Sequence, residues 1–213
     1  PYAINLNHRF TPAAERAKGW VEAGRLGTLH MIGMTMWINN PVETSPWFHM
    51  RALHPHSIDV MRYFAGDVRR VAAFFMKGEG RTIWSNAKIV MEFASGVVGS
   101  LTGSYDAGAG FGLETCDVTG SQGRFVIEEA CEHLTFYERE GKEAESYHYL
   151  GGMLGFGETF DSRISRWVDQ LDAGVAPDQV EASGLDALKA QLVIEACIRS
   201  FERSEVVEVE ELV

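Results

Sequence analysis

The sequence predicts an α+β fold: a predominantly antiparallel open sheet with helices packed on one face. Helical periodicity is clearest near the two ends of the chain, at about 12–23 and 184–203. Short extended runs separated by glycine turns occupy most of the stretch from 68 to 149. Strands grouped in the middle of a chain, with helices on either side, are typical of this class rather than of an alternating parallel sheet.

Composition and charge indicate an ordinary globular protein and exclude several partners. The 213 residues are 46% hydrophobic and 23% charged, which suffices for one core without disulfides. Lys and Arg number 19 against 30 Asp and Glu, and the net charge of −11 repels nucleic acid and anionic lipid. Cys116, Cys131 and Cys197 are widely spaced, and no apolar run reaches the roughly 18 residues of a membrane span. We therefore expect a cytoplasmic protein with no nucleic-acid and no membrane partner.

The first helix and strand follow from local signals. Thr11 is a suitable N-cap, Pro12 suits the first helical position and Gly24 ends the pattern, which predicts a helix over about 12–23. Residues 28–38 predict a strand that is apolar on both faces. Helices can cover only one of these faces, so we expect a partner domain or a second subunit on the other.

The later elements are assigned in the same way. Prolines and the lack of a clean period predict a loop over 39–54, followed by a helix from Pro55 to Ala65. Ser183 and Asp186 form a capping box for the last helix, in which we expect Leu185 and Leu188 to be buried. The remaining expectations are strands at 68–77, 82–93, 97–105, 113–119, 124–129 and 134–139, a glycine-rich loop at 151–157, a helix at 158–171 and a closing strand near 206–209.

Histidines are concentrated just before and within the helix predicted at 55–65. His56 and Asp59 stand three residues apart, so the carboxylate could orient the imidazole. A place in the first helical turn would also keep the His56 ring neutral and suited to a general base. Two other interpretations remain open: the histidines cap and pack the helix, or His49, His54, His56 and Asp59 bind a metal.

Gly108-Ala109-Gly110-Phe111-Gly112 is the one segment that invites a nucleotide-binding interpretation. Its spacing is GxGxG, and the dinucleotide fingerprint would need a glycine where Leu113 stands. We therefore predict no cofactor-binding residues in this chain.

A series of loose motifs resembles the Gfo/Idh/MocA oxidoreductases, in that family's order and over nearly the whole chain. The motifs are Asn7-His8-Arg9-Phe10-Thr11-Pro12, Ala17-Lys18, Gly24-Arg25-Leu26-Gly27, the run from His56 to Asp67, Gly120-Ser121-Gln122-Gly123, and Ser183-Gly184-Leu185-Asp186-Ala187-Leu188. The resemblance implies an open-sheet domain like the C-terminal domains of dihydrodipicolinate reductase and glyceraldehyde-3-phosphate dehydrogenase.

The resemblance also implies a division of labour between two domains. In the family an N-terminal Rossmann domain binds NAD or NADP, and a C-terminal domain builds the substrate site and the oligomer interface. Only the second part is resembled here. We expect residues 1–11 to be the tail of a missing cofactor domain and residues 12–213 to be the substrate-binding and oligomerisation domain, which forms a homodimer or homotetramer through the sheet face.

Site residues follow from the same resemblance. His56 matches the catalytic histidine and Asp59 the acid that supports it. The family often has an aspartate four residues before this histidine, where this chain has Ala52, which can neither accept nor relay a proton. His54 is the local candidate to substitute. We expect the substrate to be contacted by Arg51, His49, Trp47 and Arg9.

The implied reaction is NAD(P)-dependent oxidation of a CH–OH group of a sugar, cyclitol or related polyol. The cofactor, NAD or NADP, would be bound mainly by the absent N-terminal domain, so this chain alone would be inactive. Two alternatives stay open: a non-catalytic binding or scaffold domain of the same fold, and a metal-dependent hydrolase or isomerase that uses the histidines.

Overall fold

The computed structural model describes residues 2–107, 114–129, 132–147 and 152–209. Its strands are β1 (Leu29–Trp37), β2 (Val68–Met76), β3 (Asn86–Phe93), β4 (Val98–Ser104), β5 (Glu114–Gly120), β6 (Gly123–Glu128), β7 (His133–Glu138), β8 (Gly141–Ser146) and β9 (Val207–Glu208). They form one sheet in the order β8-β7-β6-β5-β1-β4-β3-β2-β9. Only the pairing of β1 with β4 is parallel among these strands, so the predicted α+β class with a mostly antiparallel open sheet is confirmed.

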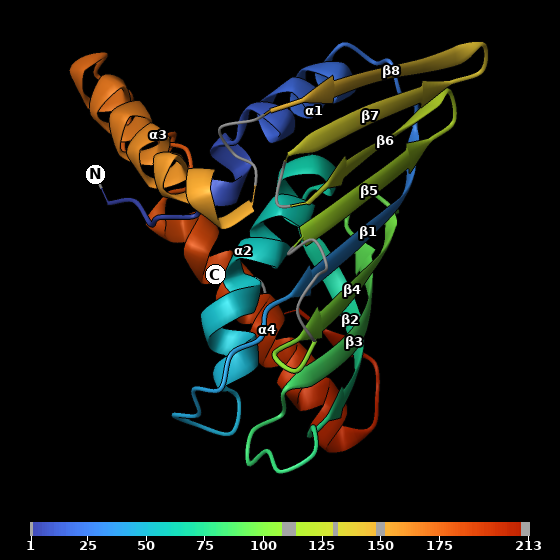
Figure 1. Cartoon of the computed structure of the whole chain (residues 1–213), viewed down its shortest axis with the longest axis vertical. Coiled ribbons are helices and arrows are strands. Elements are labelled where there is room, and N and C mark those ends of the chain that lie inside the picture. Colours follow the sequence, from blue (N-terminus) through green and yellow to red (C-terminus); the bar gives the residue numbers. More distant parts are fainter. Residues whose placement is uncertain (1, 108–113, 130–131, 148–151, 210–213) are drawn as a thin grey trace.

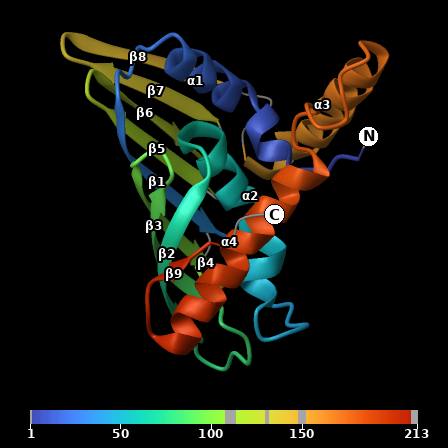
Figure 2. The same cartoon turned by 180° about the vertical axis from the view of Figure 1, so that it is seen from behind.

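The helices lie on one side of the sheet (Figures 1 and 2). They are the short 3₁₀ helix η1 (Asn7–Phe10), α1 (Pro12–Glu22), α2 (Phe48–Ala65), α3 (Gly152–Asp172) and α4 (Gly184–Arg203). The Thr11 side chain caps α1 by accepting from the Ala14 N–H, and Ser183 and Asp186 form the reciprocal capping box of α4. Both caps are confirmed. Within the described residues, no helix is long and apolar enough to cross a membrane.

The start of α2 differs from the prediction. The helix begins at Phe48 rather than Pro55, so the predicted loop over 39–54 is wrong beyond residue 47. Pro55 removes one backbone hydrogen bond, but Met50 and Leu53 before it and Ile58 after it are buried in the core, and this packing holds the helix together. His56 therefore lies in the helix interior, and the expected influence of a helix N-terminus on its ring does not apply.

Three other elements also depart from the predictions. The helix α3 begins at Gly152, within the glycine run that was predicted to be a loop. The strand β3 begins at Asn86 rather than residue 82. β8, which was not predicted, is an edge strand of largely charged side chains and lacks the apolar alternation that marks a strand in sequence. Gly108–Gly112 and Cys131 lie outside the described residues.

The core lies between α2, α4 and the inner face of the sheet. Ile58 and Met61 of α2 meet the sheet near Ile32 and Phe93, all of them nearly inaccessible to solvent. Gly99 permits this close approach, because a Cβ there would lie 2.7 Å from the Phe93 ring. Cys116 and Cys197 are buried, as expected. Leu185 and Leu188, by contrast, are 47% and 46% exposed, so their predicted burial is wrong.

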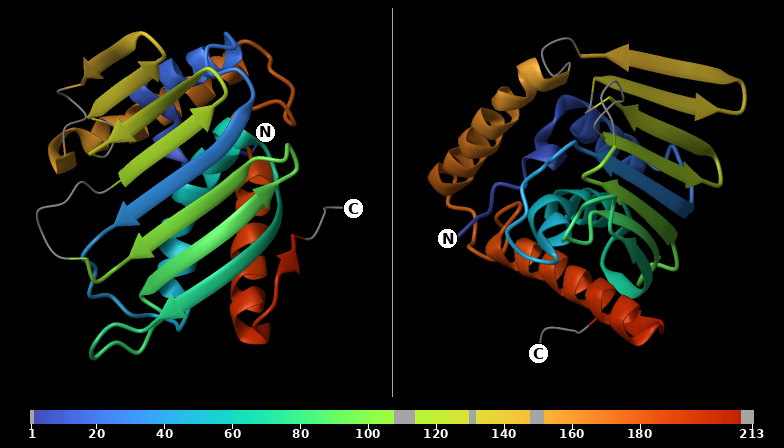
Figure 3. Two further views of the ribbon diagram at one scale, coloured as in Figure 1. Left: turned by 90° about the vertical axis from the view of Figure 1, so that its right-hand side faces the viewer. Right: turned by 60° about the horizontal axis from the view of Figure 1, so that its bottom comes forward.

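The other face of the sheet is turned to the viewer in the left part of Figure 3. Large apolar side chains are exposed on its strands: Met31, Phe74, Met76, Val90 and Val98, each at least half accessible. The sequence predicted such a two-sided apolar sheet. These side chains lie on β1, β4, β3 and β2, and Met31 of β1 is directly beside Val98 of β4.

Candidate functional site

Three segments far apart in the sequence meet around His56. η1 contributes His8 and Arg9, the middle of α2 contributes His56 and Asp59, and the first residue of β5 is Glu114. All but His56 are buried to more than nine-tenths. Buried charged side chains need partners of opposite charge, and two such pairs make up the site.

Arg9 and Asp59 form the first buried pair. Arg9 Nε donates to Asp59 Oδ2 at 2.7 Å, and Arg9 Nη2 donates to Asp59 Oδ1. The Arg9 guanidinium also lies over the Tyr63 ring, 5.3 Å from its centroid. Burial raises the pKa of Asp59, and the guanidinium opposes that shift. The spacing of Asp59 and His56 predicted that the carboxylate orients the imidazole, but both of its oxygens are directed to Arg9.

His8 and Glu114 form the second buried pair. His8 Nδ1 contacts Glu114 Oε2, and the two side chains are only 9% and 3% exposed. Burial by itself lowers the pKa of His8, but the charge and hydrogen bond of Glu114 outweigh it, so that the pKa is raised above 6.5. Next to His8, Asn7 Nδ2 donates to Thr159 Oγ1 of α3 at 2.6 Å, which ties η1 in place.

His56 stands between the second pair and a surface hollow. Its ring lies 4.6 Å from the His8 ring, centroid to centroid. Burial and the charge of His8 lower the pKa of His56 to about 3, so its imidazole is neutral at physiological pH. Among the described residues, its Nδ1 has no hydrogen-bond partner.

The hollow has a volume of about 440 Å³ and is formed by the N-terminal segment, α2 and the start of α4. Its lining is mostly apolar, from Tyr2, Ile4, Leu6, Pro55, Gly184, Ala187 and Leu188, with Asn5, His56 and Gln191 as polar groups. An apolar wall with a few polar groups is typical of small-molecule sites.

His54 and His49 lie in the core instead. Both are fully buried, and their Nε2 atoms are 3.0 Å apart, while His54 Nδ1 contacts Ser57 Oγ at 3.0 Å. Burial lowers the pKa of His49 to about 4 and that of His54 well below 6.5. A Cβ on Gly103 would lie 2.0 Å from His54 Nε2, so β4 closes directly over the ring. The structure does not bring the predicted site residues His54 and His49 to the hollow, because α2 starts earlier than predicted and turns them inward.

Arg51 and Trp47 lie at the start of α2. Arg51 makes an exposed two-pronged pair with Glu195 of α4, at 2.8 and 2.9 Å. Trp47 stacks on Trp84, with ring centroids 5.7 Å apart, and meets the edge of Phe201. Of the residues predicted for the site, the structure thus groups His56, Asp59 and Arg9. It places His49, His54 and Arg51 elsewhere on α2, and Trp47 at the N-cap of that helix.

His8 and Glu114 were not predicted for the site. His8 stands beside Arg9 in the Asn7-His8-Arg9-Phe10 motif, and that position was the one available signal. Glu114 has no local signal, because it pairs with a residue 106 positions earlier.

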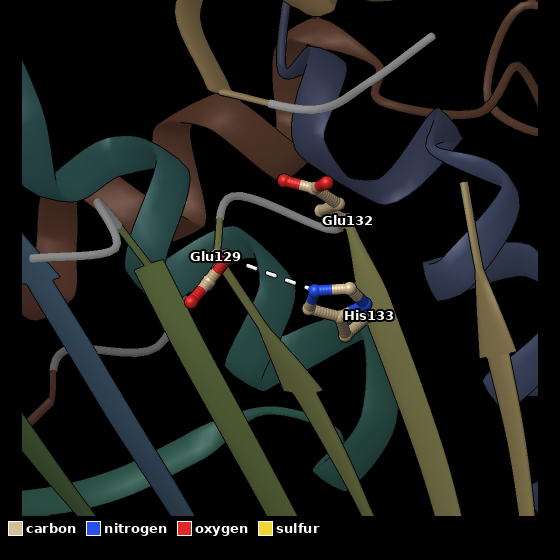
Figure 4. A group of neighbouring side chains, drawn as sticks. All are labelled: Glu129, Glu132 and His133. Atoms are coloured by element: carbon tan, nitrogen blue, oxygen red, sulfur yellow. Dashed lines mark ion pairs between the residues drawn. The ribbon is translucent and has the colours of Figure 1, made fainter. Parts of the chain in front are cut away.

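A possible metal-binding group lies at the end of β6 and the start of β7 (Figure 4). Ligand atoms of Glu129, Glu132 and His133 lie within 4.8 Å of one another. His133 Nε2 is 3.7 Å from Glu129 Oε2, and both side chains are largely exposed. Exposed carboxylates beside a histidine are common without a metal, and we assign none. The predicted alternative ligands do not converge either, because Asp59 is paired with Arg9, and His49 with His54.

Comparisons with known proteins bear on the family and the fold. Residues 14–126 match the GFO/IDH/MocA C-terminal domain. Levoglucosan dehydrogenase in complex with NADH superposes with a TM-score of 0.86 at 20% identity, covering 99% of this chain and 66% of that one. An oxidoreductase from Agrobacterium radiobacter in complex with NAD⁺, L-tartaric acid and magnesium gives 0.83 at 19%, covering 97% and 64%. A probable dehydrogenase from Thermotoga maritima gives 0.75 at 23%, covering 97% and 64%.

At these identities the solved structures establish the fold, and the chain spans about two thirds of their length. No curated protein matches the chain.

Proposed function

The chain belongs to the GFO/IDH/MocA family, and on that premise we propose that it is the substrate-binding and oligomerisation part of an NAD(P)-dependent oxidoreductase that acts on a CH–OH group of a sugar, cyclitol or related polyol. The observation that carries the proposal is the neutral, half-buried His56 ring at the hollow between the N-terminal segment, α2 and α4. Similar solved structures include one of levoglucosan dehydrogenase with NADH and levoglucosan.

The charges around His56 favour an uncharged substrate. The Arg9 guanidinium is matched by Asp59, and the His8 ring by Glu114, so neither cation is available to pair with a carboxylate or phosphate on a ligand. The apolar lining of the hollow suits the C–H face of a sugar ring, and Asn5 and Gln191 can hydrogen-bond its hydroxyl groups.

NAD or NADP would supply, when bound, the acceptor for the hydride of the carbinol carbon. The corresponding proton leaves the hydroxyl oxygen, and His56 is the group that receives it through a hydrogen bond to that hydroxyl. Because the pKa of His56 is about 3, its ring passes the proton on to solvent rather than retaining it. We further propose that a preceding domain holds most of the cofactor, since the chain spans only about two thirds of the length of similar structures solved with NAD⁺ or NADH.

The test is whether the full-length protein that contains this chain reduces NAD⁺ or NADP⁺. The absorbance of the reduced nicotinamide measures the reaction. The substrate panel should pair neutral sugars and cyclitols with the corresponding sugar acids. We expect turnover with at least one neutral member and weaker turnover with its acid counterpart. If no polyol reduces either cofactor while both cofactors bind, the chain is better described as a scaffold.

We also propose that the exposed sheet face is the interface of a homodimer or homotetramer. Phe74 is 71% exposed and Met76 60%, and a sheet face with several large exposed apolar side chains is typical of an interface. Light scattering at micromolar concentration should give at least twice the monomer mass. Phe74→Glu should dissociate the assembly, because it would place two carboxylates in a buried interface.

Val42→Glu is the matched control, since Val42 is an exposed apolar residue outside the sheet. A protein that is monomeric before any substitution would disprove the interface.

A further inference from the structure

We propose that His8, held as an imidazolium by Glu114, is a positioning residue that keeps the neighbouring His56 ring uncharged. The inference rests on the proposed function for its catalytic meaning, but the charge states it assigns can be measured without any turnover. Its basis is the geometry of two neighbouring imidazole rings, one of which contacts a buried carboxylate on the first residue of β5.

The first step concerns where the proton of the His8–Glu114 pair resides. Glu114 is 3% exposed and sits at the start of β5, with its carboxylate against His8 Nδ1. An ionised carboxylate at such depth requires a positive partner, and His8 is the partner at hydrogen-bond distance. Asp59 adds a second, weaker negative influence on the same ring. The proton is therefore held on His8.

The second step concerns the two rings. With their centroids 4.6 Å apart and their planes inclined by 38°, the two rings lie close together in a tilted arrangement. Two imidazolium ions at this separation repel strongly in a poorly hydrated site. Burial already disfavours a proton on His56, and a proton fixed on His8 adds to that effect.

The remaining charges around the two rings do not reverse this conclusion. Besides Glu114 on β5, they are Asp59 and His54 on α2 and Arg9 on η1. Asp59 is matched by Arg9, and His54 is neutral because it is fully buried. Arg163 of α3 and Asp186 of α4 interact electrostatically with the Arg9–Asp59 pair, so they influence the two rings only through that pair.

The consequence for catalysis is a division of roles between two histidines. His56 stays an acceptor for the substrate hydroxyl, and the charge on His8 prevents it from retaining the transferred proton. Neither His8 nor Glu114 needs to touch the substrate, and both act through the His56 ring.

The experiment is an NMR titration of the histidine rings in the unmodified protein, with each ring assigned by substitution. At pH 6 we expect His8 to carry both ring protons and His56 only one. In Glu114→Gln the burial of His8 is unchanged but its counter-ion is lost, so His8 should become neutral at that pH. In His8→Gln the titration midpoint of the His56 ring should rise by at least about one pH unit, because the neighbouring positive charge is gone.

His133→Gln is the control, because that ring is exposed and pairs with Glu129 at another part of the sheet. It should leave both titrations unchanged. A neutral His8 at pH 6 in the unmodified protein would overturn the proposal even if neither variant folds, and so would an unshifted His56 in a folded His8→Gln protein.

Once a substrate is found, the acid limb of the pH profile of kcat/KM should move upward in His8→Gln. Absence of turnover with every polyol would contradict the proposed function and leave the NMR result standing.

Discussion

Replacing His56 by alanine is expected to lower turnover in the full-length protein by about 10²- to 10⁴-fold, the usual contribution of a general acid or base. His56 is the one histidine of α2 that lines the hollow, and its neutral ring can accept a hydrogen bond from a substrate hydroxyl. Cofactor affinity should stay nearly unchanged, because the role assigned to the ring is toward the substrate. Steady-state kinetics with saturating cofactor would measure the loss, as a fall in kcat rather than a rise in KM alone.

The control for this substitution is His133→Ala, which removes an exposed histidine at the β6–β7 turn. It should retain full turnover. His54→Ala is informative in a different way, because His54 is fully buried against His49 and Ser57. We expect that variant to lose stability more than activity. Unchanged turnover in His56→Ala, with folding verified by circular dichroism, would remove the catalytic assignment and favour a scaffold.

Breaking the Arg9–Asp59 pair should produce the largest loss of stability among the charge substitutions. Arg9→Met would leave the Asp59 carboxylate, which is 1% exposed, without its partner, and removal of one member of a buried pair costs about 3–5 kcal/mol. Urea unfolding followed by circular dichroism would measure this change in the free energy of unfolding. The double variant Arg9→Met, Asp59→Leu should recover much of the loss, because no isolated charge is then buried.

Arg51→Met is the matched control for that comparison. Arg51 also forms a two-pronged bond with a carboxylate, but the Arg51 and Glu195 side chains are 46% and 42% exposed. Solvent screens such a pair, and we expect its loss to cost at most about 1 kcal/mol. Equal effects of Arg9→Met and Arg51→Met would show that the buried pair is not a principal stabilising element.

The parts of the fold that were predicted correctly are those with a local chemical signal. Thr11 and Pro12 mark the start of α1, and the Ser183–Asp186 box marks the start of α4, because each satisfies backbone groups within one helical turn. Elements without such signals differ from the predictions. The sequence predicts that α2 starts at Pro55, although buried contacts on both sides carry the helix through it, and β8 has no apolar face to reveal it.

From the sequence alone, the α+β class, most of the strands and the family resemblance can be predicted, and His56 can be singled out as a candidate. Which charged groups are partners, and which histidines are accessible, depends on the tertiary structure. Asp59 pairs with Arg9 from 50 residues away, and Glu114 with His8 across 106. The reason is physical: the charge state of a side chain depends on its burial and on charges within a few ångströms, and chain folding sets both over distances that local spacing does not encode.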